Sequence, residues 1–203
     1  MLRLGRFALL PLVAGAGCVD LLVMGDYGTR DARQASVARG LAAVASVRQP
    51  AAVAAIGDNL YPSGADYNPW TIVRWWRDVY MGYDSLNRPW HVITGNHDWM
   101  TDGTVERDFT SSSENPGGHW QMPDFWFKKT YAADGLTVDA FYIDTQVWKG
   151  SYLADQTIGR QARQRQIDWL FSQLEKSTAD WKIVLGHHPI YSAGNHGMTE
   201  VLY

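Results

Sequence analysis

Four short polar segments each follow an apolar, strand-like run, and this repeated pairing constrains the fold more than any other feature of the chain. In each segment a glycine precedes side chains that can bind a metal ion. Residues just past the carboxyl ends of parallel strands gather at one edge of a sheet, so we expect one shared site. The segments are Gly25-Asp26-Tyr27-Gly28, Gly57-Asp58-Asn59-Leu60-Tyr61, Gly95-Asn96-His97-Asp98 and Gly186-His187-His188-Pro189.

Strand and helix patterns alternate along the chain, which predicts an α/β fold with a largely parallel sheet covered by helices. The polar, Gly/Ser/Asn-rich stretch 102–118 predicts a long surface loop. We expect strands at 19–24, 51–56, 90–94, 125–131, 136–144 and 181–185. We expect a first helix from a cap at Thr29 or Asp31 to about Val47. A second helix should begin at Pro69 and carry Trp70, Val73, Trp76 and Val79 on one stripe. A third should cover 158–176, with Ile167, Leu170, Phe171 and Leu174 at core spacing.

The composition is that of a globular chain. Its 203 residues suffice for one domain with a core, and 46% of them are hydrophobic. The net charge of -3 indicates neither a nucleic-acid nor an anionic-membrane partner. Ten Trp and ten Tyr are assigned to packing rather than to carbohydrate binding. A single cysteine, Cys18, excludes an internal disulfide.

Residues 1–18 have the pattern of an export signal. Arg3 and Arg6 precede an uncharged run that ends in small residues, and this run is too short to span a bilayer. We therefore expect a signal-like segment at 1–18, a domain at 19–203, and export to the periplasm or the medium. Lipid anchoring at Cys18 is disfavoured, because a core strand begins almost at once. The alternative is a cytosolic chain with extra apolar residues at its start.

Five side chains of the four segments form a donor set for two metal ions: Asp26, Asp58, Tyr61, Asn96 and His187. Asp58 is the natural bridge, because one carboxylate can offer an oxygen to each of two cations. Asp26 and Tyr61 would then hold one ion, and Asn96 and His187 the other. A phenolate ligand favours a highly charged ion, since only such an ion readily displaces a proton of pKa near 10; this argues for Fe(III) beside Tyr61.

Such a metal pair grips phosphate oxygens and activates water, which predicts hydrolysis of a small phosphate ester. The leaving group then needs a proton or a positive neighbour. His97 is placed to help, with Asp98 orienting its ring, and His196 on a later loop could reach the same phosphate.

Three other polar residues near the motifs are expected to have no catalytic role. His91 is expected to be structural. His188 should point away from the metals, because neighbouring side chains alternate along an extended chain. Asp144 is expected to orient a neighbouring loop.

These motifs resemble the calcineurin-like metallophosphoesterases and, more narrowly, the purple acid phosphatases of the small, tartrate-resistant type. Most members of the wider superfamily carry Asp-x-His in the first motif, whereas Gly28 stands in place of that histidine here and Tyr61 replaces the lost ligand. The resemblance implies a four-layer α/β/β/α fold and hydrolysis of phosphate monoesters at acid pH. It also implies an Fe(III)–M(II) centre, with M being Fe, Zn or Mn, and assigns substrate contacts to His97 and His196.

One departure from this family concerns the end of the chain. The family completes its centre with a Gly-His-x-His motif beyond the loop that contains His196, and this sequence has no such motif. We therefore expect a domain that is incomplete at its C-terminus. Two alternatives stay open: a phosphodiesterase or nucleotidase on the same scaffold, and a non-catalytic fragment that lacks two of seven ligands.

Overall fold

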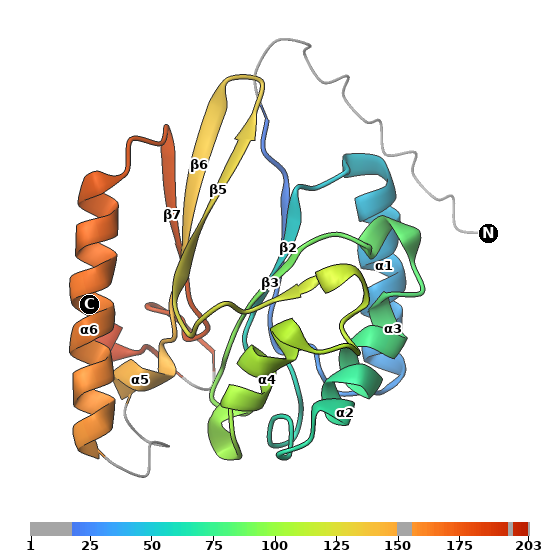
Figure 1. Cartoon of the computed structure of the whole chain (residues 1–203), viewed down its shortest axis with the longest axis horizontal. Coiled ribbons are helices and arrows are strands. Elements are labelled where there is room, and N and C mark those ends of the chain that lie inside the picture. Colours follow the sequence, from blue (N-terminus) through green and yellow to red (C-terminus); the bar gives the residue numbers. More distant parts are fainter. Residues whose placement is uncertain (1–17, 150–155, 195–196, 203) are drawn as a thin grey trace.

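The computed structural model describes residues 18–149, 156–194 and 197–202 and arranges them in four layers (Figure 1). Two sheets lie face to face, and helices cover the outer side of each sheet. The predicted α/β fold with layered sheets and flanking helices is confirmed. Within the described ranges, no helix is long and apolar enough to cross a membrane. The predicted export signal lies outside the described residues, apart from Cys18, which is exposed.

The first sheet has four parallel strands in the order β1-β2-β3-β4. Three of its strands are the continuous apolar runs that the sequence predicts, each preceding one of the polar segments. Since all four strands run in the same direction, these segments emerge at one edge of the sheet. The strands are β1 (Leu21–Met24), β2 (Ala52–Ile56), β3 (Trp90–Ile93) and the short β4 (Trp120–Gln121), which the sequence did not predict.

The second sheet has three strands in the order β5-β6-β7. β5 (Phe127–Ala133) and β6 (Leu136–Tyr142) form an antiparallel hairpin, and β7 (Trp181–Leu185) pairs with β6 in parallel. Asp134 and Gly135 connect the hairpin with φ values of 49° and 82°. Two positive φ angles are what a tight two-residue hairpin turn requires, so Asp-Gly suits this position.

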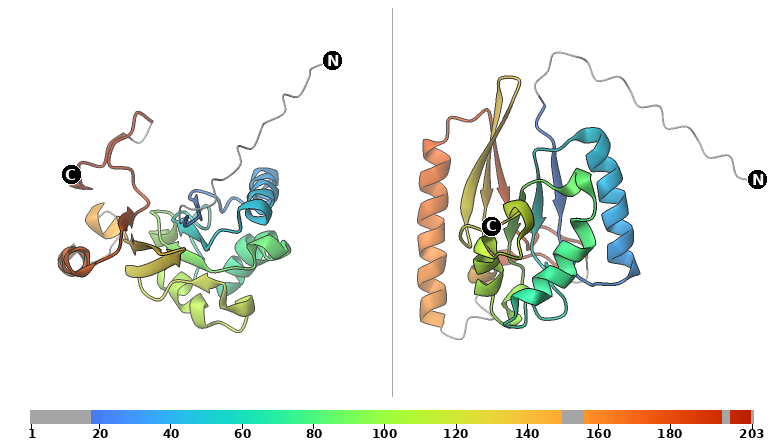
Figure 2. Two further views of the ribbon diagram at one scale, coloured as in Figure 1. Left: turned by 90° about the horizontal axis from the view of Figure 1, so that it is seen from above. Right: turned by 45° about the vertical axis from the view of Figure 1, so that its right-hand side comes forward.

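The helices differ in length and regularity. Asp31 caps the first helix by accepting hydrogen bonds from the backbone N–H groups of Arg33 and Gln34. Figure 2 shows the last long helix, α6, on the opposite side of the molecule from α1. The helices are α1 (Ala32–Arg48), α2 (Pro69–Ile72), α3 (Asp78–Tyr80), α4 (Thr104–Asp108), α5 (Gln146–Lys149) and α6 (Gln156–Lys176). Shorter helical turns are η1 (Val73–Arg77), η2 (Asp84–Leu86), η3 (Asp98–Met100), η4 (Phe109–Ser111), η5 (Pro116–Gly118) and η6 (Glu200–Leu202).

Two predicted core positions on helices were wrong. Trp70 is 49% exposed, whereas Ile72 and Tyr80 are buried. The helical segment that begins at Pro69 contains a π-helical turn, η1, so a single stripe at 3.6-residue spacing does not describe it. On α6, Leu170 is buried as expected, but its neighbour Phe171 is 66% exposed.

The stretch 102–118 is not the surface loop that its composition predicts. It forms α4, η4 and η5, and it buries Glu106, Phe109 and Asn115. The Asn115 side chain donates to the carbonyl of Trp120 and accepts from the N–H of the same residue. These buried residues are isolated in a polar sequence and follow no period, so pattern analysis misses them.

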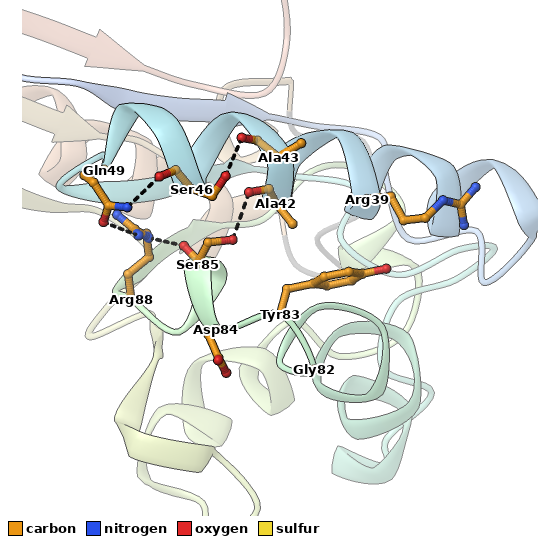
Figure 3. A pocket seen from close by; sticks show the side chains of 10 residues that line it. All are labelled: Arg39, Ala42, Ala43, Ser46, Gln49, Gly82, Tyr83, Asp84, Ser85 and Arg88. Carbon is orange, nitrogen blue, oxygen red and sulfur yellow. Dashed lines mark hydrogen bonds between the residues drawn. The ribbon is translucent and has the colours of Figure 1, made fainter.

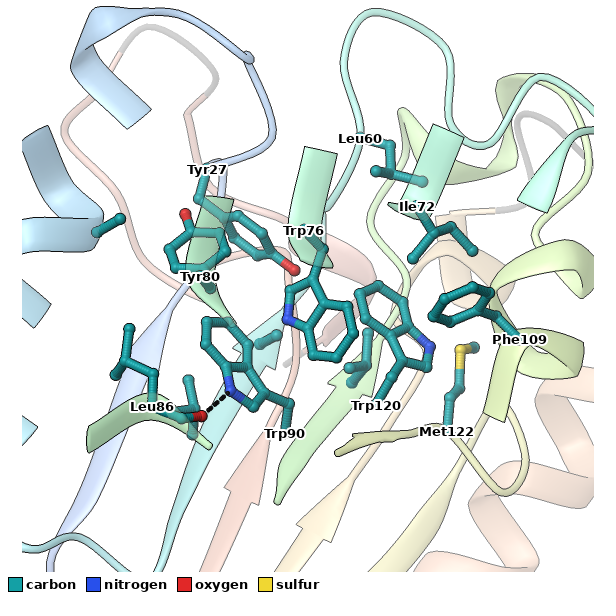
Figure 4. Close-up of a cluster of buried hydrophobic side chains, with 14 of the residues drawn as sticks. Tyr27, Leu60, Ile72, Trp76, Tyr80, Leu86, Trp90, Phe109, Trp120 and Met122 are labelled. Carbon is teal, nitrogen blue, oxygen red and sulfur yellow. Dashed lines mark hydrogen bonds between the residues drawn. The ribbon is translucent and has the colours of Figure 1, made fainter. Parts of the chain in front are cut away.

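Three apolar clusters hold the four layers together. The largest lies between the first sheet and its helices, where the rings of Trp76, Trp90, Phe109 and Trp120 meet edge to face (Figure 4). The second cluster fills the space between the two sheets, and the third lies between β6 and α6. Much of the heavy aromatic load therefore serves packing, as predicted.

One hydrogen-bonded chain crosses the otherwise apolar space between the sheets. His91 Nδ1 lies 2.6 Å from the Tyr131 hydroxyl, which lies 2.8 Å from the Tyr142 hydroxyl. His91 Nε2 lies 3.2 Å from Gln121 Oε1, an atom that can only accept, so Nε2 carries the proton. The neutral ring thus satisfies both neighbours. Burial, with the charge of Lys129 added, lowers the pKa of His91 to about 4.

The buried His91 makes a testable contribution to the pH dependence of stability. In the unfolded chain its pKa is about 6.5, so between about pH 6.5 and 4 the unfolded state takes up a proton that the folded state refuses. Stability therefore falls as the pH drops through this window. The free energy of unfolding is measured with urea at pH 7 and at pH 4.5. We expect the loss between these two pH values to be smaller in His91→Gln than in the wild type, by on the order of 2 kcal/mol. Equal losses in the two proteins contradict this account.

Truncation of Phe109 tests the packing of segment 102–118. Phe109 is 1% exposed, so Phe109→Ala leaves a cavity and is expected to lower the free energy of unfolding by about 3–5 kcal/mol. The control is Ser113→Ala, an exposed position in the same segment, expected to change it by less than about 0.5 kcal/mol. A surface loop at 102–118 would make both substitutions neutral in denaturant titration.

Candidate metal centre

Asp26 and Asp58 occupy equivalent places at the carboxyl ends of β1 and β2. Both have a left-handed backbone, with φ values of 55° and 51°, and Gly57 has a φ of 96°. The Asp26 N–H donates to the Gly57 carbonyl at 3.0 Å, which ties the two turns together. Left-handed non-glycine residues cluster at functional sites, where the surrounding structure compensates their strain.

Asp58 lies between two groups of donor atoms. Its Oδ2 accepts a hydrogen bond of 2.6 Å from the Tyr61 hydroxyl, which also lies 3.0 Å from Asp26 Oδ1. Its Oδ1 lies 3.4 Å from His187 Nε2, which in turn lies 3.3 Å from Asn96 Oδ1. The structure thus brings all five predicted ligands together. One ligand atom from each of Asp26, Asp58 and His187 lies within 4.8 Å of the others.

The His187 ring is oriented through the nitrogen that points away from the other candidate ligands. Its Nδ1 lies 3.1 Å from the carbonyl oxygen of Ile56. A carbonyl only accepts, so Nδ1 carries the proton and donates it. Nε2 faces two further acceptor oxygens, Asp58 Oδ1 and Asn96 Oδ1, so a cation among these three atoms would take the place of a hydrogen on Nε2. Fixing a ligand histidine through its second nitrogen is a recurring feature of metal sites.

Two motif glycines leave room for this ring. A Cβ atom on Gly57 would lie 2.8 Å from His187 Nδ1, and one on Gly95 would lie 2.9 Å from His187 Cδ2 and overlap the Asp58 carboxylate. Any side chain at either position would therefore displace a candidate ligand. The glycines are required by this close approach of ring and backbone.

Gly28 is required by a different contact. A Cβ atom there would overlap the carbonyl of Asn59 and lie 2.8 Å from Leu60 Cα. The Gly28 carbonyl accepts a hydrogen bond of 2.9 Å from the N–H of Tyr61. The backbone that presents Tyr61 therefore runs through the space that a side chain at position 28 would need.

Tyr61 is a protonated phenol in this arrangement. Burial, followed by the hydrogen bond and the charge of Asp58, raises the pKa of its hydroxyl far above its usual value. Its single proton is shared between two carboxylates. A cation bound here would replace that proton and relieve the repulsion between Asp26 and Asp58.

The predicted role of Asp98 differs from its observed contacts. Asp98 is fully buried and accepts hydrogen bonds from the N–H groups of Asn59, Leu60 and Gly95 at 2.8–3.2 Å. The His97 ring is instead oriented by the Pro62 carbonyl, 2.5 Å from Nδ1. Asp98 thus fixes the backbone of two motif loops rather than an imidazole. The motif Gly95-Asn96-His97-Asp98 by itself gives no sign of the backbone partners in the loop after β2.

A second buried carboxyl group supports Asp98. Glu106 is fully buried, and its Oε2 accepts from Asn59 Nδ2 at 2.9 Å. Burial, with the charge of Asp98 added, raises the pKa of Glu106 well above its usual value, and burial raises that of Asp98 to about 6. Glu106 is therefore the carboxyl group that keeps its proton. Sequence analysis missed it because it lies in the stretch assigned to a loop.

The remaining predicted residues have the following positions. His97 Nε2 faces the centre, 3.9 Å from Asp58 Oδ2, and its ring centroid lies 4.5 Å from that of Tyr61. His196 lies outside the described residues. His91 is structural, as expected. His188 is turned toward the Thr145 hydroxyl, 2.7 Å from its Nδ1, and Asp144 accepts from Trp99 Nε1 at 2.9 Å.

The candidate ligands line a cavity of about 550 Å³ at the edge of the sheets, large enough for a small phosphate ester. A larger cavity of about 710 Å³ lies between α1 and the turn before β3 (Figure 3), but it contains no comparable donor set. There Arg88 already donates to backbone carbonyls. The smaller cavity is lined by Asp26, Asp58, Tyr61, Asn96, His97, Met100, Lys149, His187, His188, Pro189, Ser192, Gly194, Gly197 and Thr199.

Comparisons with known proteins find acid phosphatases among the relatives of this chain. Tartrate-resistant acid phosphatase type 5 of Rattus norvegicus is 27% identical, with 100% of this chain and 67% of that protein covered. Purple acid phosphatase 7 of Arabidopsis thaliana is 29% identical, with 92% and 58% covered. The chain thus spans only about half to two thirds of the length of these relatives.

Among solved structures, GAP50, the anchor in the inner membrane complex of Plasmodium, superposes with a TM-score of 0.75 at 22% identity. The alignment covers 90% of this chain and 58% of that one, and at this identity it supports the fold alone. The model of the calcineurin-like phosphoesterase family matches residues 19–203, which include all four motifs. The chain therefore belongs to the calcineurin-like phosphoesterase family.

Proposed function

We propose that this chain supplies the centre of an acid phosphatase that hydrolyses phosphate monoesters with two metal ions. The observation that carries the proposal is the position of Asp58. Its two oxygens face different donor groups, Tyr61 at 2.6 Å and His187 at 3.4 Å. A carboxylate placed in this way suits a bridge between two cations.

The donor atoms fit two different ions. Asp26 and Tyr61 offer a carboxylate and a phenol oxygen, which suit Fe(III). Asn96 and His187 offer an amide oxygen and an imidazole, which suit a divalent ion such as Fe, Zn or Mn. The similarity to purple acid phosphatases supports the same assignment.

When bound, the two ions supply charge stabilisation for the phosphoryl group and lower the pKa of a bound water. The chain itself positions the substrate and moves a proton. His97 Nδ1 is fixed on the Pro62 carbonyl, so Nε2 is the atom that faces the cavity. A hydrogen on this nitrogen is donated to a phosphate oxygen or to the leaving group. We assign His196 to the same phosphate.

A substrate panel on the metal-loaded protein tests this function. We expect hydrolysis of phenyl phosphate and no comparable hydrolysis of bis(phenyl) phosphate, measured as released phenol. Faster turnover of the diester favours the phosphodiesterase alternative. Absence of turnover of both esters by a protein that holds two metals contradicts the proposal.

Asp58→Asn tests the bridge. The substitution keeps the size of the side chain but removes its charge, so we expect loss of metal from both positions and a fall in kcat/KM of more than about 100-fold. The control is Asp66→Asn, which removes the same charge from an exposed residue on the same loop. Elemental analysis and phosphate release are measured on both variants. Wild-type metal content in Asp58→Asn would show that the carboxylate bridges nothing.

Tyr61→Phe tests the Fe(III) position. A phenolate bound to Fe(III) absorbs visible light, so we expect a coloured wild-type protein and a colourless variant, recorded by absorption spectroscopy. Iron content is measured alongside, so that loss of the ligand band is separated from loss of the metal. Colour that survives in an iron-loaded Tyr61→Phe protein would exclude Tyr61 as its source.

A further inference from the structure

Lys149 is the single Lys or Arg among the described residues that line the metal-centre cavity. It ends α5, and its side chain is exposed to the cavity and solvent. Lys149 reaches the cavity from the side of the second sheet, because α5 follows β6, whereas Tyr61 and Asp26 follow strands of the first sheet.

The short helix that carries Lys149 is fixed to the metal-centre loops. Asp144, fully buried, accepts from the N–H of Gln146 at 2.8 Å and from Trp99 Nε1 at 2.9 Å. This one carboxylate therefore joins the start of α5 to the loop that follows β3. The position of Lys149 is thus set by the framework that also sets Asn96 and His97.

A second set of contacts joins α5 to the loop after β7. The Thr145 hydroxyl lies 2.7 Å from His188 Nδ1 and accepts from the His188 N–H at 3.1 Å. A Cβ atom on Gly186 would lie 2.6 Å from Thr145 Cγ2, so the two segments are in close contact. His188, the neighbour of His187, is therefore hydrogen-bonded to Thr145, the residue just before α5.

Among the described residues, no carboxylate forms an ion pair with Lys149. The carboxylates that line the cavity, Asp26 and Asp58, belong to the candidate metal centre. An ammonium group on the cavity wall that forms no ion pair with the carboxylates of the centre suits an anion that is not the phosphate undergoing reaction.

We propose that Lys149 is a specificity residue that binds a second anionic group of the substrate, while the reacting phosphate lies at the Asp58 centre. This inference rests on the function proposed above. The second anionic group could be a phosphate or a carboxylate, because an ammonium group binds both. Substrates with such a group would be preferred over those with an uncharged tail, through tighter binding rather than faster chemistry.

Phosphonates that resist hydrolysis separate this inference from turnover. The metal-loaded protein is titrated calorimetrically with phenylphosphonate, with 3- and 4-carboxyphenylphosphonate, and with 1,4-phenylenediphosphonate. The two carboxylates test two distances, and the diphosphonate tests phosphate against carboxylate. We expect the wild type to bind at least one ligand with a second anion about tenfold more tightly than phenylphosphonate.

The variants are Lys149→Met, Lys149→Arg and Lys176→Met. We expect Lys149→Met to lose the roughly tenfold preference and Lys149→Arg to keep most of it. Lys176→Met, which removes the same charge at an exposed position on α6, should keep it fully. Phenyl phosphate hydrolysis by the wild type is measured separately and reports on the proposed function alone. A wild type without the preference, or a preference that survives in Lys149→Met, overturns the inference.

Discussion

The buried carboxylate of Asp98 is the interaction on which the geometry of the centre depends. It gathers backbone N–H groups from the loop after β2 and from the loop after β3, and so fixes the two turns that present Asp58 and Asn96. A buried charge is costly unless it is fully hydrogen-bonded, and here backbone donors supply those bonds. Glu106, which keeps its proton, accepts a hydrogen bond from the Asn59 side chain and so holds the loop after β2 from its buried side.

The candidate ligands come from both sheets, so their geometry depends on how the two sheets pack together. The first sheet delivers Asp26, Asp58 and Asn96, and the loop after β7 of the second sheet delivers His187. The apolar cluster between the sheets, together with the His91–Tyr131–Tyr142 chain, sets the distance between them. The centre therefore depends on an interface between the strands that end just before its candidate ligands and the β5-β6 hairpin.

Much of this fold could be predicted from the sequence, because buried parallel strands are continuous apolar runs and the polar segments mark their ends. The gathering of the five candidate ligands at one edge followed from the same reasoning. The roles of Asp98, Glu106 and Asn115 could not be predicted from residue spacing. Asp98 and Asn115 bind backbone groups, Glu106 binds the Asn59 side chain, and the fold brings these partners together. The exposure of Trp70 and Phe171 shows a different limit, since spacing alone does not reveal a π-helical turn or the edge of a helix stripe.

The close packing at Gly28 limits which substitutions a site of this kind can accept. The backbone of Asn59 and Leu60 fills the space beside it, so a histidine at position 28 and the present path of the loop to Tyr61 exclude each other. Neither residue can be exchanged alone without a clash or the loss of a donor. A change from one donor set to the other therefore requires a new loop path and substitutions at both positions together.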